Sequence, residues 1–205
     1  MSDEPQPHQR RVRYAGTHPK RFEEKYKELD PVRHADAIQK VMDRGQTPAG
    51  MHRSICVNEI LGILNPQPGE TGLDATLGFG GHAKEILARL MPGGHLFAVD
   101  VDPLELPRTE ARLRALGFGE QALTVRRINF SELATLLPEA GGGFDVVLAD
   151  LGVSSMQIDN PARGFSFKAD GPLDLRLDPS SGQSASELLQ SVTRQRLRDL
   201  MVDNA

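Results

Sequence analysis

The chain has 205 residues, of which 39% are hydrophobic, and a formal net charge of −4. This content is enough to bury one core, which excludes wholesale disorder and indicates one globular unit. The negative charge excludes a general electrostatic attraction to nucleic acid, so an RNA partner needs a local basic patch or a complementary surface.

Targeting and membrane signals are the next classes to consider. The first residues, MSDEPQPHQRRVRY, lack the apolar stretch of a secretory signal, and Asp3 and Glu4 are atypical of a mitochondrial leader. No apolar run reaches the roughly 18 residues of a membrane span. We therefore expect a cytoplasmic protein without a membrane partner.

Cys56 is the only cysteine in the sequence. A single cysteine excludes an internal disulfide and a cysteine-based metal cluster. Because Cys56 stands outside every motif, we interpret it as a small core residue. His52 and His82 have no second ligand at a workable spacing, so no metal site is predicted.

The first predicted elements are a polar extension and a helix. Residues 1–50 mix acidic and basic side chains, which is typical of a solvated extension, although an arm that grips RNA stays an alternative. From Ser54, a plausible N-cap, the segment ICVNEILGIL has apolar residues at helical spacing until Pro66. We expect this helix to lie on the core.

The middle of the chain alternates between short apolar runs and longer amphipathic runs. The pattern predicts strands near 71–76, 95–100, 122–128 and 144–150, and helices near 82–91, 103–116 and 131–138. This order is typical of an α/β fold with a parallel sheet and right-handed crossovers. We therefore assign residues 51–152 to a Rossmann-like core that contains the first four strands.

The pattern changes after Asp150. The stretch LGVSSMQIDNPARGFSFKADGPLDLRLDPSSGQ is rich in turn residues and too long for a simple connection. A final helix is predicted from Ser184, whose spacing to Glu187 is that of a capping box, through Met201. Residues 153–205 are interpreted as the loop and helix that begin an inserted substrate-recognition module.

The turn DATLGFGGH lies between the first predicted strand and the second predicted helix. Gly78, Gly80 and Gly81 allow a sharp turn and a close approach of the backbone to a ligand, which the amides of the next helix can bind. Gly78, Gly80 and Ala83 also satisfy the dinucleotide pattern G-x-G-x-x-G/A, a weak signal on its own. A nucleotide-like ligand is predicted here.

Acidic residues help to decide which nucleotide fits. Asp100, at the end of the second strand, can accept hydrogen bonds from a ribose in any adenosine-containing cofactor. Asp74 lies in the strand before the glycines, and Asp150 ends the fourth predicted strand. Carboxylates repel a pyrophosphate but attract the sulfonium and ammonium groups of S-adenosylmethionine. This favours the methyl donor over NAD, and Asp74 either contacts it or only stabilises the turn.

Several motifs in register resemble one family. DATLGFGGH, VDVDP, INF at 128–130, LADLGVSSMQID, RGFSF and DGPLDLRLD closely resemble the bacterial 16S rRNA cytosine-N4 methyltransferases. The resemblance runs from His52 to about Leu189. It implies a class I S-adenosylmethionine-dependent methyltransferase with a helical insertion after the fourth strand, acting on 16S rRNA within the small ribosomal subunit.

The resemblance also implies roles for individual residues. Gly80, Gly81 and His82 would contact the methionine part of the cofactor, Asp100 the ribose, Phe130 the adenine region, and Asp150 and Gln157 the reacting end. In the RGFSF loop, Arg163 is a candidate phosphate contact, and Phe165 and Phe167 are candidates for stacking a flipped base or for a small core of the loop itself.

The resemblance implies methylation at the exocyclic N4 of a cytidine. Transfer to this nitrogen is helped by an acceptor for its proton. Asp150 is either that acceptor or only a cofactor ligand. Methylation at carbon 5 would need a cysteine nucleophile, and Cys56 lies outside every motif.

Family members continue past Ala205, so we expect this chain to be an N-terminal fragment or truncated member without the C-terminal strands. Its fourth strand would then be an open edge that favours pairing with another chain, for example in a homodimer. A truncated module that binds cofactor or RNA without turnover is therefore the second hypothesis. A nicotinamide-dependent oxidoreductase is the third, from the glycine pattern alone.

Overall fold

The computed structural model describes residues 54–204, and the predicted extension at 1–50 lies outside this range. Its elements, in chain order, are α3 (Val57–Leu64), β1 (Thr71–Asp74), α4 (Gly81–Leu90), β2 (His95–Val99), α5 (Glu105–Ala115), β3 (Leu123–Arg126), the 3-10 helix η2 (Phe130–Leu136), β4 (Val146–Leu148), α6 (Ser155–Asp159), the 3-10 helix η3 (Pro161–Arg163), α7 (Ala185–Ser191) and α8 (Arg194–Asp203).

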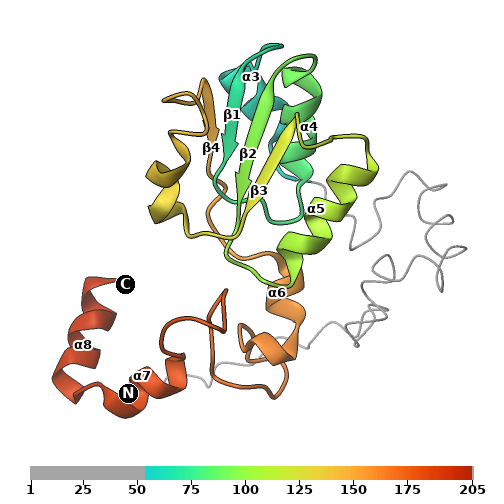
Figure 1. The fold of residues 1–205 in the computed structure, drawn as a ribbon. Coiled ribbons are helices and arrows are strands. Elements are labelled where there is room, and N and C mark those ends of the chain that lie inside the picture. Colours follow the sequence, from blue (N-terminus) through green and yellow to red (C-terminus); the bar gives the residue numbers. More distant parts are fainter. Residues whose placement is uncertain (1–53, 205) are drawn as a thin grey trace, which may run out of the picture.

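The four strands form one parallel sheet in the order β3-β2-β1-β4 (Figure 1). Leu73 of β1 lies beside Phe97 of β2 on one side and Val147 of β4 on the other. The chain therefore builds outward from β1 through β2 to β3 and then returns to the opposite side of β1. This arrangement confirms the predicted parallel, Rossmann-like sheet.

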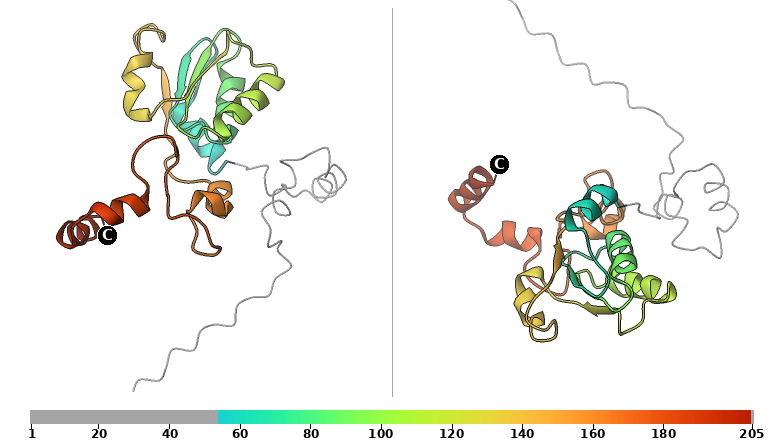
Figure 2. Two further views of the ribbon diagram at one scale, coloured as in Figure 1. Left: turned by 60° about the horizontal axis from the view of Figure 1, so that its bottom comes forward. Right: turned by 90° about the horizontal axis from the view of Figure 1, so that it is seen from above.

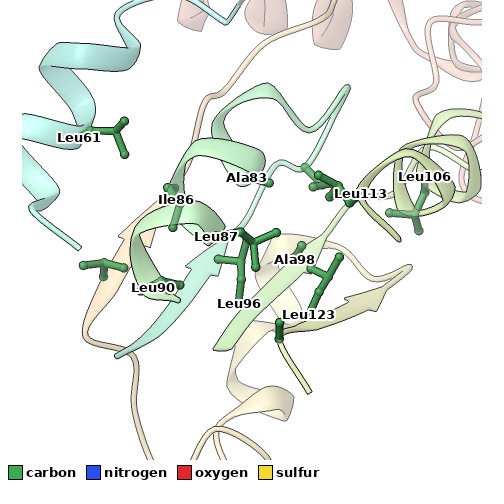
Figure 3. Close-up of a cluster of buried hydrophobic side chains, with 13 residues drawn as sticks. Leu61, Ala83, Ile86, Leu87, Leu90, Leu96, Ala98, Leu106, Leu113 and Leu123 are labelled. Carbon is green, nitrogen blue, oxygen red and sulfur yellow. The ribbon is translucent and has the colours of Figure 1, made fainter. Parts of the chain in front are cut away.

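Apolar side chains cover both faces of the sheet because successive residues of a strand point to opposite sides. On one face, Leu96 and Ala98 of β2 pack under α4 and α5. The fully buried Leu87 of α4 belongs to the same cluster (Figure 3). On the other face, Phe97 and Val99 pack with Leu136 of η2. Both faces of the sheet are thus packed against other elements, and the carboxyl ends of its strands meet at one edge.

The first described helix differs from its prediction. It begins at Val57, and its N-cap is Cys56 in a left-handed conformation with φ 52° rather than Ser54. Leu61 packs on the core as expected. Cys56 is exposed, so its interpretation as a core residue is wrong. It stands at the corner before the helix, where its side chain is not part of the helix's apolar face.

Two later helices also differ. The predicted helix at 131–138 is the 3-10 helix η2, and the single helix predicted from Ser184 is divided into α7 and α8. Val192 is extended at the division, with ψ 138°, and Thr193 then caps α8 by accepting a hydrogen bond from the Arg196 amide. The capping box of Ser184 and Glu187 is confirmed.

The segment after β4 contains more structure than its composition predicts. Ser154 and Gln157 form a capping box that begins α6, a helix absent from the sequence-based prediction. Beyond η3 the chain continues to α7 and α8, which extend away from the sheet (Figures 1 and 2). The division between a core at 51–152 and a module at 153–205 stays a prediction. None of the helices within residues 54–204 is long and apolar enough to cross a membrane.

Candidate functional site

A cavity of about 580 Å³ opens at the carboxyl ends of the four strands. The strand order reverses here, because the chain proceeds from β1 to β2 and β3 and then to β4 on the other side of β1; ligand sites in parallel sheets usually lie at such a point. Its wall combines the turn after β1, the loops after β2, β3 and β4, and residues from the flanking segments, including Ser54, Ile55, Thr76, Phe79, Val101, Asp102, Glu105, Asn129, Leu151, Ser154, Met156 and Leu177.

The glycine turn forms one wall of this cavity. The Gly78 amide donates a 2.7 Å hydrogen bond to Asp100 Oδ2, which fixes the turn to the end of β2. Gly80 is the N-cap of α4 and has φ 79°, a conformation that glycine adopts without strain. A Cβ at Gly80 would lie 2.7 Å from Thr109 Cγ2 of α5, so the turn is packed tightly against this helix.

The loop after β2 has two carboxylates that support each other. Asp100 Oδ1 accepts a 2.9 Å hydrogen bond from the Asp102 amide. Asp102 Oδ1 in turn accepts hydrogen bonds from the amides of Leu104 and Glu105, at the beginning of α5. Asp100 thereby faces the cavity in a fixed position, with both oxygens held on the protein side by backbone amides.

Asp150 and His82 lie together at the N-terminus of α4, next to the glycine turn. His82 Nε2 is 2.9 Å from the Ile55 carbonyl oxygen, which can only accept, so Nε2 carries the hydrogen and donates it. His82 Nδ1 then faces Asp150 Oδ2 at 3.6 Å. The Asp150 amide donates to Thr76 Oγ1, while its carboxylate is 49% exposed and accessible from the cavity.

Asp74 lies beneath the site rather than in its wall. Its side chain is 1% exposed, is absent from the cavity wall and accepts a 3.0 Å hydrogen bond from the Thr76 amide. Burial raises the pKa of Asp74 to about 6, although the Thr76 hydrogen bond and the charge of His82 act in the opposite direction. The geometry therefore favours the turn-stabilising role over direct contact with a ligand.

Most of the predicted cofactor residues meet at the cavity. Those in its wall are Gly78, Gly80, Gly81, His82, Asp100, Phe130, Asp150 and Gln157. Phe130 is 51% exposed, as expected for a side chain that could lie against a ring of a ligand. The individual contacts of these residues to a cofactor stay predictions.

The three predicted substrate residues lie outside the cavity wall. Phe167 is 98% exposed, whereas Phe165 is partly buried and its ring centroid lies 5.9 Å from the Arg163 guanidinium. Arg163 is itself buried and pairs with Asp102, which places its charge where an RNA phosphate does not reach it. Its phosphate contact stays a prediction that this geometry does not support.

Sequence reasoning missed two groups that shape the site. Asp102 was visible in the VDVDP motif, but only Asp100 was assigned a role. Arg112 of α5 lies over the Phe79 ring at 3.7 Å and donates to Thr109 Oγ1, while Thr109 donates to the Gly78 carbonyl oxygen. Through these contacts with Phe79 and Gly78, the α5 residues fix the position of the glycine turn. No group of three or more potential metal ligands occurs among the described residues.

Comparisons with known proteins agree with this architecture. A model of the MraW methylase family matches residues 49–205. Ribosomal RNA small subunit methyltransferase H 2 of Alkaliphilus metalliredigens is 58% identical over 205 residues, which are 100% of this chain and 58% of that protein. Ribosomal RNA small subunit methyltransferase H 1 of Lachnoclostridium phytofermentans is 57% identical over 97% of this chain and 54% of its own length.

The chain thus spans between half and two thirds of the length of these curated relatives. Among solved structures, TrmN from Thermus thermophilus is 23% identical with a TM-score of 0.39, covering 58% of this chain and 35% of that one. This structural likeness is too weak to bear on function.

Proposed function

The chain belongs to the MraW methylase family and has the class I methyltransferase fold, and from this premise we propose that it forms the cofactor-binding part of an rRNA methyltransferase. The proposed reaction transfers a methyl group from S-adenosylmethionine to N4 of a cytidine in 16S rRNA of the small ribosomal subunit. Two relatives more than half identical to this chain carry the name ribosomal RNA small subunit methyltransferase H, which supports the substrate class.

The proposal rests on the hydrogen bonds and charges around the glycine turn. In a dinucleotide site, turn amides and the helix N-terminus receive a pyrophosphate. Here the Gly78 amide already donates to the Asp100 carboxylate, and the Asp150 carboxylate stands near the N-terminus of α4. The Asp150 carboxylate repels a phosphate and attracts a cation, and the Gly78 amide is already used by Asp100; both features favour S-adenosylmethionine over NAD.

The residues fit this cofactor along the whole cavity. In the proposed arrangement, Asp100 binds the ribose hydroxyls, Phe130 lies against the adenine, and the turn at Gly80 and Gly81 binds the methionine part. All four residues line the cavity, which supports this arrangement. When bound, S-adenosylmethionine supplies a methyl group on a positively charged sulfur. Gln157 is a weaker candidate contact, because its side chain already bonds Asp102 and the Ser154 amide.

Asp150 is proposed to help the amine react. The N4 of cytosine gains the methyl group and loses a proton, and an acceptor within hydrogen-bond reach promotes this change. The half-exposed Asp150 carboxylate is available for that hydrogen bond, while His82 stands behind it at 3.6 Å. The fully exposed Phe167 is proposed to stack the base once it has left the RNA helix.

Calorimetric titration of the chain with S-adenosylmethionine, with NADH in parallel, tests the cofactor. We expect micromolar binding of S-adenosylmethionine and no binding of NADH. Binding of NADH alone would instead support an oxidoreductase. Incubation with small ribosomal subunits and a labelled methyl donor then separates an enzyme from a binding module, which would bind the cofactor without labelling the RNA.

Asp150→Asn separates the two roles of Asp150. If Asp150 accepts the proton, we expect the rate of methyl transfer to fall at least about tenfold while the Kd for the cofactor changes less than about threefold. A cofactor ligand would show the reverse pattern. Asp170→Asn is the control, since this exposed carboxylate in the same part of the chain is absent from the cavity wall.

A further inference from the structure

We infer that Arg163 is a positioning residue that couples the segment 160–177 to the cofactor cavity, so that cofactor binding orders this segment and the ordered segment strengthens cofactor binding. The inference rests on the proposed function, since it names how that site communicates with the part of the chain that would meet the RNA. It assigns Arg163 to the interior of the protein rather than to an RNA phosphate.

The contacts of Arg163 join two distant parts of the chain. Its Nη1 donates to Asp102 Oδ2 at 3.0 Å, and its Nη2 donates to the Leu177 carbonyl oxygen at 2.8 Å. Arg163 is 8% exposed and Asp102 is 1% exposed. Leu177 and Asp102 both line the cavity, so one buried guanidinium connects two parts of its wall.

A continuous series of hydrogen bonds leads from Arg163 to the glycine turn. Asp102 Oδ2 accepts from Arg163, the Asp102 amide donates to Asp100 Oδ1, and Asp100 Oδ2 accepts from the Gly78 amide. Asp100 is the residue proposed to bind the ribose. A ligand that holds Asp100 therefore also favours the position of Asp102 to which Arg163 binds.

The charges of Arg163 and Asp102 favour one position of the segment 160–177. Burial acts to raise the pKa of Asp102, but the hydrogen bonds from Gln157 and Leu104 and the charge of Arg163 act more strongly, so its pKa is lowered overall. Asp102 is thus an anion inside the protein, and movement of Arg163 away from it would leave a buried charge without its partner. The segment consequently has one favoured docked position.

Arg163→Met removes the cation of this buried pair and costs stability, because Asp102 stays charged without it. In Arg163→Met, Asp102 would keep hydrogen bonds from Gln157, Leu104 and Glu105, so the sheet and α5 retain their connection. What is lost is the link to the segment that ends at Leu177. The coupling can therefore be removed while the cavity wall on the sheet side persists.

Hydrogen exchange of the unmodified chain, with and without S-adenosylmethionine, is the first test. We expect slower exchange at 76–82, in the cavity wall, and about fivefold slower exchange at 160–177. Protection at 76–82 alone would overturn the inference and leave the proposed function standing. Protection at neither segment, with no heat of binding, would contradict the proposed function itself.

Arg163→Met is the second test. Because coupling is reciprocal, we expect the Kd for S-adenosylmethionine to rise about tenfold, and saturating cofactor should no longer slow exchange at 160–177. Arg163→Lys should recover part of both effects, since an ammonium can still reach Asp102 but cannot hold Leu177 in the same fork. Unchanged affinity and unchanged protection would overturn the inference.

Arg176→Met is the matched control. Arg176 makes a bidentate pair with Asp174, two residues away, and also donates to the Gly182 carbonyl oxygen, all within the same part of the chain. Within residues 54–204, its hydrogen bonds and its ion pair do not involve the cavity wall. Like Arg163→Met, the variant Arg176→Met removes an arginine and its ion pair. If both variants lost the same affinity for S-adenosylmethionine, Arg163 would act only through local stability.

Discussion

Gly80→Ala is expected to reduce the affinity for S-adenosylmethionine by more than about 100-fold. Gly80 has φ 79°, and a Cβ there would stand 2.7 Å from Thr109 Cγ2. Thr109 is fully buried and donates to the Gly78 carbonyl oxygen, so it cannot move aside without releasing the turn. The turn would shift away from α5 and into the space where the methionine part of the cofactor is proposed to bind.

Two further variants separate the collision from simple backbone strain. Gly141 has φ 72° with open space around it, so Gly141→Ala imposes similar strain away from the cavity and should leave the affinity unchanged. Adding Thr109→Ser to Gly80→Ala removes the colliding methyl group but keeps the hydroxyl, and should restore part of the affinity. Calorimetry on the three variants checks this; full affinity in Gly80→Ala would refute a tightly packed turn.

The sheet could be predicted from the sequence because three of its strands are short runs that end in or shortly before an aspartate, namely Asp74, Asp100 and Asp150. Helix ends were harder to predict. The apolar pattern from Leu188 continues past Val192 without a glycine or proline, yet Val192 is extended and Thr193 begins a new helix. A side-chain cap, rather than the periodicity, decides where this helix divides.

The site was predictable only where it depends on strand ends. The carboxyl ends of parallel strands meet at one edge, which brings Asp100, Asp150 and the glycine turn together. The pairing of Arg163 with Asp102 joins residues 61 positions apart, and no local pattern indicates it. The exposure of Cys56 was missed for the same reason, since burial depends on how distant segments pack.

Asp74→Asn is expected to raise the free energy of unfolding at pH 7.5 by up to about 3 kcal/mol. Burial raises the pKa of Asp74 from 3.8 to about 6 in the folded chain. Between these values the folded state binds more protons than the unfolded state, so stability decreases as the pH rises. The contribution of the protonated carboxyl is complete below about pH 3.8 and is lost as the pH passes through about 6.

Asparagine is neutral at every pH and can still accept the hydrogen bond from the Thr76 amide. Denaturant unfolding should therefore show a gain for Asp74→Asn at pH 7.5 that disappears near pH 4. Asp145→Asn is the control, because Asp145 also accepts one backbone amide, from Thr71, but is exposed. A similar gain in Asp145→Asn would mean that general charge reduction, rather than burial of Asp74, is responsible.

The same variant tests which role Asp74 has in binding. Asp74 is absent from the cavity wall, so a turn-stabilising carboxylate predicts nearly unchanged affinity for S-adenosylmethionine in Asp74→Asn. Direct contact with the cationic end of the cofactor predicts instead a loss that grows as the pH rises above about 6, where the parent carboxyl becomes charged. Calorimetry at pH 5.5 and 7.5 on the parent chain and on Asp74→Asn distinguishes these outcomes. The difference in affinity between the two chains depends on pH only if the Asp74 charge interacts with the ligand.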